Sequence, residues 1–85
     1  MADVEIAVTL RLFGSFRRHG DTIGLSLPPG GTAAQVKERL ARILPPEDAG
    51  LVRESVLADE HEIIGDDAVL SRDTVLAILP PVCGG

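Results

Sequence analysis

Hydrophobic and polar residues alternate in two short stretches near the start of the chain. The first stretch covers residues 5–13 and the second covers residues 22–27. A period of two is typical of a strand with one buried face. Gly20-Asp21 between the stretches is a turn signal, so we predict an antiparallel hairpin. The expected inward positions are Ile6, Val8, Leu10, Leu12, Ile23, Leu25 and Leu27.

A helical pattern follows residues 28–31, Pro-Pro-Gly-Gly, which cannot continue a strand. Thr32 and Gln35 match a capping box, in which each side chain binds the other residue's backbone amide. Apolar residues then recur with the spacing of one helix face, and Pro45-Pro46 ends the helix. The expected buried stripe is Val36, Leu40, Ile43 and Leu44.

The second half of the chain predicts short strands. Residues 47–54 fit either a helical turn or a loop, whereas Ser55–Ala58 and Glu62–Ile64 are strand candidates. Thr74–Leu79 is apolar after its first residue, so both faces of this last strand need cover. One face meets the helix, and the other is a candidate partner surface. This order of elements predicts an α+β fold, a ubiquitin-like β-grasp with a small mixed sheet packed on one main helix.

The composition fits one small domain with an aliphatic core. Of the 85 residues, 45% are apolar and only two are aromatic. The net charge of −5 argues against nucleic acid or an anionic membrane surface as the main partner. Without a membrane span or the basic start of a signal peptide, we expect a cytoplasmic protein. We expect residues 1–79 to form the domain and residues 80–85 a flexible tail.

The chain ends in a segment that carries its own chemistry, Pro80-Pro81-Val82-Cys83-Gly84-Gly85. The two prolines end the strand, and the residues after them are expected to project as a thin, extended arm. The reactive group is the α-carboxylate of Gly85. Once activated, for example as an acyl-adenylate, this carboxylate could accept sulfur or form an acyl bond to an amine.

Cys83 is the single cysteine, so an internal disulfide and a zinc site built from cysteines are excluded. Two roles remain open for it. It is either a small residue suited to a narrow channel, or a thiol that captures the activated Gly85 carbonyl. His19 and His61 are expected to be exposed loop residues rather than metal ligands.

Two segments resemble a known family. Leu12–Arg18 is similar to the end of the first strand in MoaD-type sulfur carriers, and Leu79–Gly85 is similar to their Pro-Pro-Val-x-Gly-Gly terminus. These carriers are the small subunit of molybdopterin synthase and are related to the thiamine sulfur carrier ThiS. Position 83, usually Ala or Ser in the family, is Cys here.

The resemblance implies a co-substrate rather than an enzyme. A MoeB-like adenylating enzyme of the ubiquitin-activating type would use ATP to adenylate Gly85, and the carrier itself would bind no cofactor. A sulfurtransferase or desulfurase would then supply sulfur for a thiocarboxylate. The tail, with Pro80, Pro81, Val82, Cys83 and Gly84, would enter a catalytic MoaE-like large subunit. The resulting heterotetramer would make the dithiolene of molybdopterin.

Alternatives remain open for the surface that docks a partner and for the pathway in which the protein acts. Phe13 alternates out of phase with the inward residues of the first strand. Together with Leu76 and Ile78 of the last strand, it is a candidate docking surface. Local packing of the loop after the first strand is the alternative. Carriers for thiamine, cysteine, tRNA thiolation or natural products share this scaffold. A ubiquitin-like modifier and a passive interaction domain are the other classes to test.

Overall fold

The predicted hairpin forms part of a five-stranded sheet in the computed structural model, which describes residues 5–81. Strands β1 (Ile6–Leu12) and β2 (Thr22–Leu27) pair antiparallel along their length. Their connection is not the simple turn predicted, because Gly14–His19 forms a 3-10 helix, η1, before the chain reverses at Gly20. The strands of the hairpin are confirmed, and the predicted connection is wrong.

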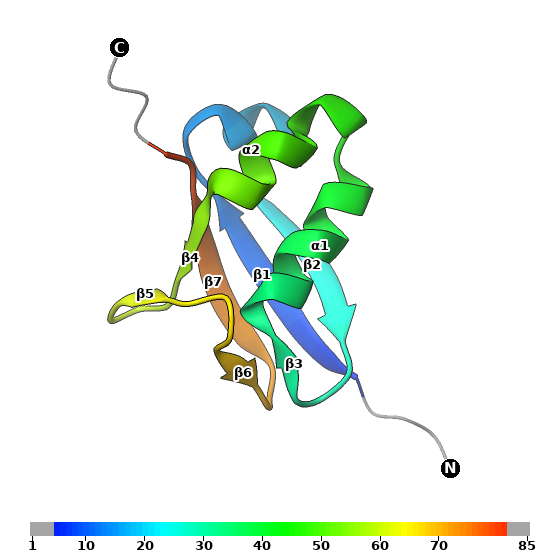
Figure 1. The fold of residues 1–85 in the computed structure, drawn as a ribbon, viewed down its shortest axis with the longest axis vertical. Helices are drawn as coiled ribbons and strands as arrows, with labels where there is room; N and C mark the ends of the chain where they lie inside the picture. The colour runs from blue at the N-terminus through cyan, green and yellow to red at the C-terminus, as the bar shows by residue number, and fades with distance from the viewer. Residues whose placement is uncertain (1–4, 82–85) are drawn as a thin grey trace.

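The last strand, β7 (Thr74–Leu79), lies at the centre of the sheet (Figure 1). The strand order is β2-β1-β7-β4-β5, with β7 parallel to β1 and antiparallel to β4 (Val56–Ala58). The short strand β5 (Ile63–Ile64) forms one edge. A separate pair joins β3 (Gly31–Thr32) to β6 (Val69–Leu70). Because β7 is bonded on both sides, the residues after it leave from a fixed point.

Helix α1 (Ala33–Ile43) begins at the predicted capping box. The Thr32 amide donates to Gln35 Oε1 at 2.8 Å, and the Gln35 amide donates to Thr32 Oγ1 at 3.4 Å. The predicted stripe is wrong at one position, because Ile43 is 53% exposed, whereas Leu44 is buried. Proline at the next position disfavours helical backbone at Leu44, which therefore turns inward in an extended conformation.

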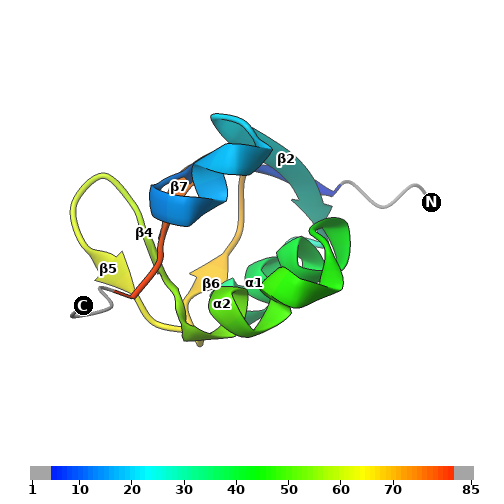
Figure 2. The same ribbon diagram turned by 90° about the horizontal axis from the view of Figure 1, so that it is seen from above.

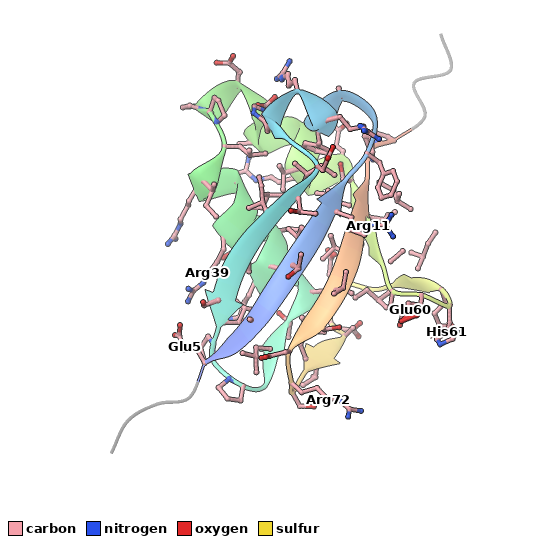
Figure 3. The ribbon with its side chains drawn as sticks, turned by 180° about the vertical axis from the view of Figure 1, so that it is seen from behind. Glu5, Arg11, Arg39, Glu60, His61 and Arg72 are labelled. Carbon is pink, nitrogen blue, oxygen red and sulfur yellow. The ribbon has the colours of Figure 1, made fainter. Side chains whose placement is uncertain are left out.

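The segment of uncertain pattern is helical. A short 3-10 turn, η2 (Pro46–Asp48), leads into helix α2 (Ala49–Glu54). Both α1 and α2 lie on one side of the sheet (Figure 2). Figure 3 looks onto the opposite side, which no helix of residues 5–81 covers.

The core lies between the sheet and α1. Its side chains are aliphatic except for Phe16, which reaches inward from η1 and is 1% exposed. The buried apolar residues are Ile6, Val8, Leu10, Leu12, Phe16, Leu25, Leu27, Ala33, Val36, Leu40, Leu44, Val52, Leu57, Leu76 and Ile78. The predicted α+β fold, a mixed sheet on one main helix, is confirmed. Across residues 5–81, no helix is long and apolar enough to cross a membrane.

Candidate functional site at the end of the last strand

The site predicted from the sequence begins where β7 ends. Leu79 is the last residue of the strand, Pro80 is half-buried and Pro81 is exposed. Neither proline can donate a hydrogen bond to a neighbouring strand, so the sheet stops here as predicted. Four predicted tail residues lie outside the described residues, namely Val82, Cys83, Gly84 and Gly85. Their proposed roles remain predictions.

Buried neighbours on both sides hold the end of β7 in place. Ile78 lies opposite Leu12 of β1 and opposite Leu57 of β4. All three side chains are at most 2% exposed. Burial of each such side chain contributes roughly 1.5–3 kcal/mol. The chain therefore leaves the sheet from a well-packed position, at the end of the molecule where η1 lies (Figure 1).

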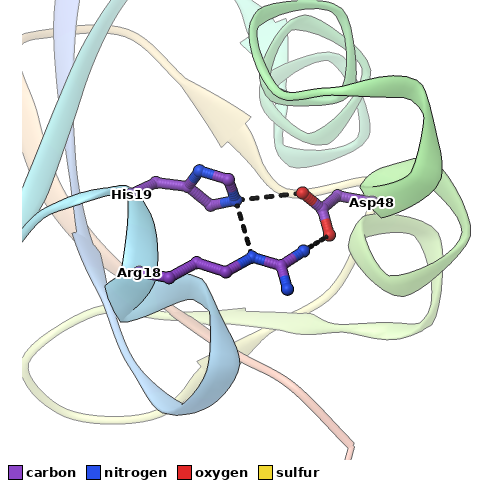
Figure 4. Close-up of polar contacts among 3 residues, drawn as sticks. All are labelled: Arg18, His19 and Asp48. Carbon is purple, nitrogen blue, oxygen red and sulfur yellow. Dashed lines mark hydrogen bonds and ion pairs between the residues drawn. The ribbon is translucent and has the colours of Figure 1, made fainter.

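An ionic cluster fixes η1 against the start of α2 (Figure 4). Asp48 is buried, with 4% of its surface exposed, and its carboxylate receives a hydrogen bond from the Arg18 guanidinium. His19 Nε2 lies 2.9 Å from the other Asp48 oxygen. Buried carboxylates are costly unless charged or polar partners surround them, and both partners here come from η1. The cluster ties together segments about thirty positions apart in the chain.

The geometry of this cluster selects one proton arrangement on His19. Arg18 Nε approaches the same Nε2 atom at 3.3 Å. One ring nitrogen cannot accept from Arg18 and donate to Asp48 at the same time. The shorter contact with a carboxylate favours a hydrogen on Nε2 that is donated to Asp48. His19 is 20% exposed on its side chain, so the prediction of an exposed loop histidine is wrong for it.

The predicted docking surface needs correction. Leu76 and Ile78 are 2% and 0% exposed, because they point from β7 into the core toward α1. They are therefore unavailable to a partner. Phe13 is half-buried, and the Arg11 guanidinium lies 5.6 Å from the centre of its ring. Figure 3 shows Arg11 on the side of the sheet that the helices leave open.

The outer face of the sheet carries a different set of apolar side chains along β7 and beside it. Strand alternation places them on the side opposite the core, and Val75 and Val56 are 53% and 40% exposed. Their alignment follows from the register, in which Val56 lies opposite Leu79. We call these residues the sheet patch: Phe13, Val56, Val75, Ala77 and Leu79.

Two hollows differ in their relation to this patch. The smaller, about 450 Å³, lies on the outer sheet face beside Val75 and is bordered by Glu60, His61 and Asp73. Figure 3 shows Glu60 and His61 on the loop beside the sheet. The larger hollow, about 810 Å³, lies between α1 and α2, and no residue of β1 or β7 lines it. The smaller hollow therefore extends the sheet patch with an acidic border.

Residues 5–81 contain no cluster of three His, Cys, Asp or Glu side chains placed to hold a metal ion. His19 is committed to Asp48, and the exposed His61 lies on the loop between β4 and β5. The geometry therefore provides a structural role for His19 and identifies no ligand set within the described part of the chain.

Asp59 stabilises the loop between β4 and β5 through its charge. Its Oδ1 accepts hydrogen bonds from the amides of His61 and Glu62, each at 2.8 Å. These bonds favour the ionised form, so the pKa of Asp59 lies below the usual value for an aspartate. The stabilisation is fully present above the unfolded-state pKa and is lost as the pH falls through the lower folded-state pKa.

We expect Asp59→Asn to weaken the dependence of stability on pH below about pH 4, because the variant lacks this titrating charge. Urea unfolding at several acidic pH values measures the effect. Asp67→Asn is the matched control, since none of the side-chain hydrogen bonds among residues 5–81 ends on the Asp67 carboxylate. If the free energy of unfolding fell equally with acidic pH in wild type and in Asp59→Asn, this account of the loop would be contradicted.

The Asp48 cluster was missed by reasoning from the sequence. Its members are adjacent only after η1 and η2 have packed together, and no spacing rule connects Arg18 with Asp48. The amino-acid sequence contained only a weak signal for the sheet patch. Alternation separates Val75, Ala77 and Leu79 from the buried residues of the same strand, but it does not tell which set faces the helix.

The fold is that of ubiquitin-like β-grasp proteins, as comparison with solved structures confirms. SAMP1 from Haloferax volcanii superimposes with a TM-score of 0.76 at 16% identity, over 93% of this chain and 99% of its own. A Pyrococcus furiosus protein described provisionally as molybdopterin converting factor, subunit 1, gives a TM-score of 0.68 at 20% identity, over 91% of this chain and 99% of its own.

The ubiquitin of Caldiarchaeum subterraneum gives a TM-score of 0.65 at 16% identity, over 96% of this chain and 100% of its own. No protein-family model and no curated protein matches the sequence. At these identities the likeness establishes the fold. The protein thus has the ubiquitin-like β-grasp fold.

Proposed function

We propose that the protein is a sulfur carrier that presents Gly84 and Gly85 to an adenylating enzyme of the ubiquitin-activating type. The observation that carries the proposal is the position of Pro80-Pro81 at the end of a central strand that is paired on both sides. The tail therefore starts from a fixed point beside an open sheet face. In this proposal the carrier supplies a substrate carboxylate and its partners supply the catalytic residues.

The proposed chemistry takes place at the carboxylate of Gly85. This carboxylate attacks the α-phosphorus of ATP on the partner enzyme, which gives an acyl-adenylate and pyrophosphate. A persulfide on a sulfurtransferase then displaces AMP and forms an acyl disulfide. A thiol cleaves that disulfide, is itself oxidised to a disulfide, and leaves the thiocarboxylate on Gly85. A MoaE-like large subunit would then use this sulfur to make the dithiolene of molybdopterin.

The sheet patch supports a docking role on the open face of β7, the strand from which the tail starts. Its exposed valines offer an apolar centre, and the neighbouring hollow has an acidic border at Glu60 and Asp73. A partner with apolar residues flanked by a cationic side chain would complement this face. The likeness in fold to the Pyrococcus furiosus converting factor supports the molybdopterin pathway within the proposal.

A protein modifier is the second candidate, supported by the likeness in fold to a structure of H. volcanii small archaeal modifier protein 1. In that case Gly85 would be joined to a lysine of another protein. The single lysine of this chain, Lys37, is a poor acceptor. Its Nζ donates to the Arg53 carbonyl at 3.1 Å and to Asp66 Oδ1 at 3.3 Å, and its side chain is 11% exposed. Chains linked through Lys37 are therefore not expected.

Incubation with ATP, the adenylating enzyme of the same cells and a sulfur donor tests the proposal. The carrier function predicts a mass gain equal to the replacement of one oxygen by sulfur. Covalent adducts of higher mass in cells would favour the modifier function instead. No change that depends on ATP would contradict both functions and favour a passive interaction domain.

A further inference from the structure

The first residue of η1 has no room for a side chain, because the tail base occupies the space. Gly14 has a positive φ of 60°, a conformation that favours glycine. A Cβ at this position would lie 2.6 Å from Pro80 Cγ and 3.4 Å from Pro80 Cδ. Carbon atoms that are not bonded pack best at about 3.5–4.0 Å. The Pro80 ring therefore fills the place of a side chain at Gly14.

The strand register explains why these two residues meet. β1 and β7 run parallel with Leu12 opposite Ile78, so two further residues bring Gly14 beside Pro80. Pro80 has no amide hydrogen with which to continue the ladder. At this point β1 turns into η1, and the glycine permits both the turn and the close approach.

The Asp48 cluster makes η1 a firm support for this contact. Arg18 and His19, at the other end of η1, both bind the buried Asp48 carboxylate. Phe16, in the middle of η1, is 1% exposed and packs in the core. With these anchors, η1 cannot easily move away from the proline ring, and any added bulk at position 14 has to displace Pro80.

We propose that Gly14 is a positioning residue, whose contact with Pro80 sets the direction in which the tail leaves the sheet. This inference rests on the proposed function and deepens it. The sheet patch would govern how tightly the activating enzyme binds, and the Gly14–Pro80 contact would govern how Gly85 is aligned with ATP. Binding and alignment are therefore separable in kinetics.

Gly14→Ala is expected to lower kcat for adenylation roughly tenfold to a hundredfold, because small misplacements of a reacting group have effects of this size. KM for the carrier should stay within about twofold of the wild-type value, because the docking face is unchanged. Pyrophosphate release by the adenylating enzyme, measured at a series of carrier concentrations, separates the two constants.

Two further variants test the cause of the loss. Pro80→Ala removes Cγ and Cδ, and the remaining Pro80 Cβ would lie 3.9 Å from a Cβ at position 14, an ordinary contact. Addition of Gly14→Ala to Pro80→Ala should therefore cause no further loss of kcat. Gly30→Ala is the strain control, since Gly30 has φ 87° and no atom within 4 Å of an added Cβ. It should keep the wild-type kcat.

Each outcome decides the inference. Wild-type kcat in Gly14→Ala, an additive loss in the double variant, or an equal loss in Gly30→Ala would overturn it. Should Gly14→Ala fail to fold, a selective loss of kcat in Pro80→Ala supports the contact, and unchanged kcat there overturns it. Should wild type fail to be adenylated, the proposed function fails. In that event NMR signals of the Pro80 ring in Gly14→Ala still show whether the ring is displaced.

Discussion

Deletion of Gly85 is expected to abolish the ATP-dependent mass gain and to leave the fold unchanged. The buried core consists of residues within the described part of the chain, so we expect removal of Gly85 to leave it intact. The deletion shortens the reach of the tail by about 3.4 Å, which takes the carboxylate out of line for attack on ATP. Intact mass after incubation measures the modification, and urea unfolding measures the stability.

Gly50→Ala is the matched control for the deletion, because it alters an exposed glycine of α2 with no atom within 4 Å of the added carbon. This variant should be modified like wild type and be as stable or slightly more stable. An unreduced mass gain in the deletion variant would show that the reactive carboxylate is not that of Gly85.

Leu76→Ala is expected to destabilise the protein by about 2–5 kcal/mol, since Leu76 is buried in the central strand opposite Leu10. Val75→Ala, one residue earlier on the outer face, should change stability by less than about 1 kcal/mol. The pair thus separates the core face of β7 from its partner face. Urea unfolding curves give both free energies.

Binding gives the complementary result for the same strand. Val75→Asp places a charge in the sheet patch and should raise KM for the activating enzyme at least about tenfold, because the charge must be desolvated on docking. Its kcat should change little. Equal effects of Leu76→Ala and Val75→Ala on stability, or an unchanged KM for Val75→Asp, would contradict the assignment of the two faces.

Most of the fold could be predicted because local rules suffice for its elements. Alternation identified β1 and β2, a continuous apolar run identified β7, and the Thr32–Gln35 capping box located the start of α1. The end of α1 departs from the predicted stripe of buried residues, and this departure also has a local cause. Periodicity extends the helix through Leu44, whereas the following proline removes that residue from it.

The surroundings of the tail base could not be predicted, because they depend on residues that only the fold brings together. Asp48 is a buried carboxylate in a segment without clear periodicity, and its partners precede it by about thirty positions. The choice of Leu76 and Ile78 as a docking surface failed for a related reason. Alternation divides the apolar residues of β7 into two sets on opposite faces of the sheet. It does not tell which of these faces meets α1.

The central claim, that Gly85 carries the transferred sulfur, is tested most directly on the C-terminal peptide. After incubation with ATP, the adenylating enzyme and a sulfur donor, trypsin cleavage at Arg72 releases residues 73–85 for fragmentation in a mass spectrometer. The account predicts one oxygen replaced by sulfur in the fragment that contains only Gly85. Sulfur found on Cys83 instead, or a peptide of unchanged mass, would contradict it.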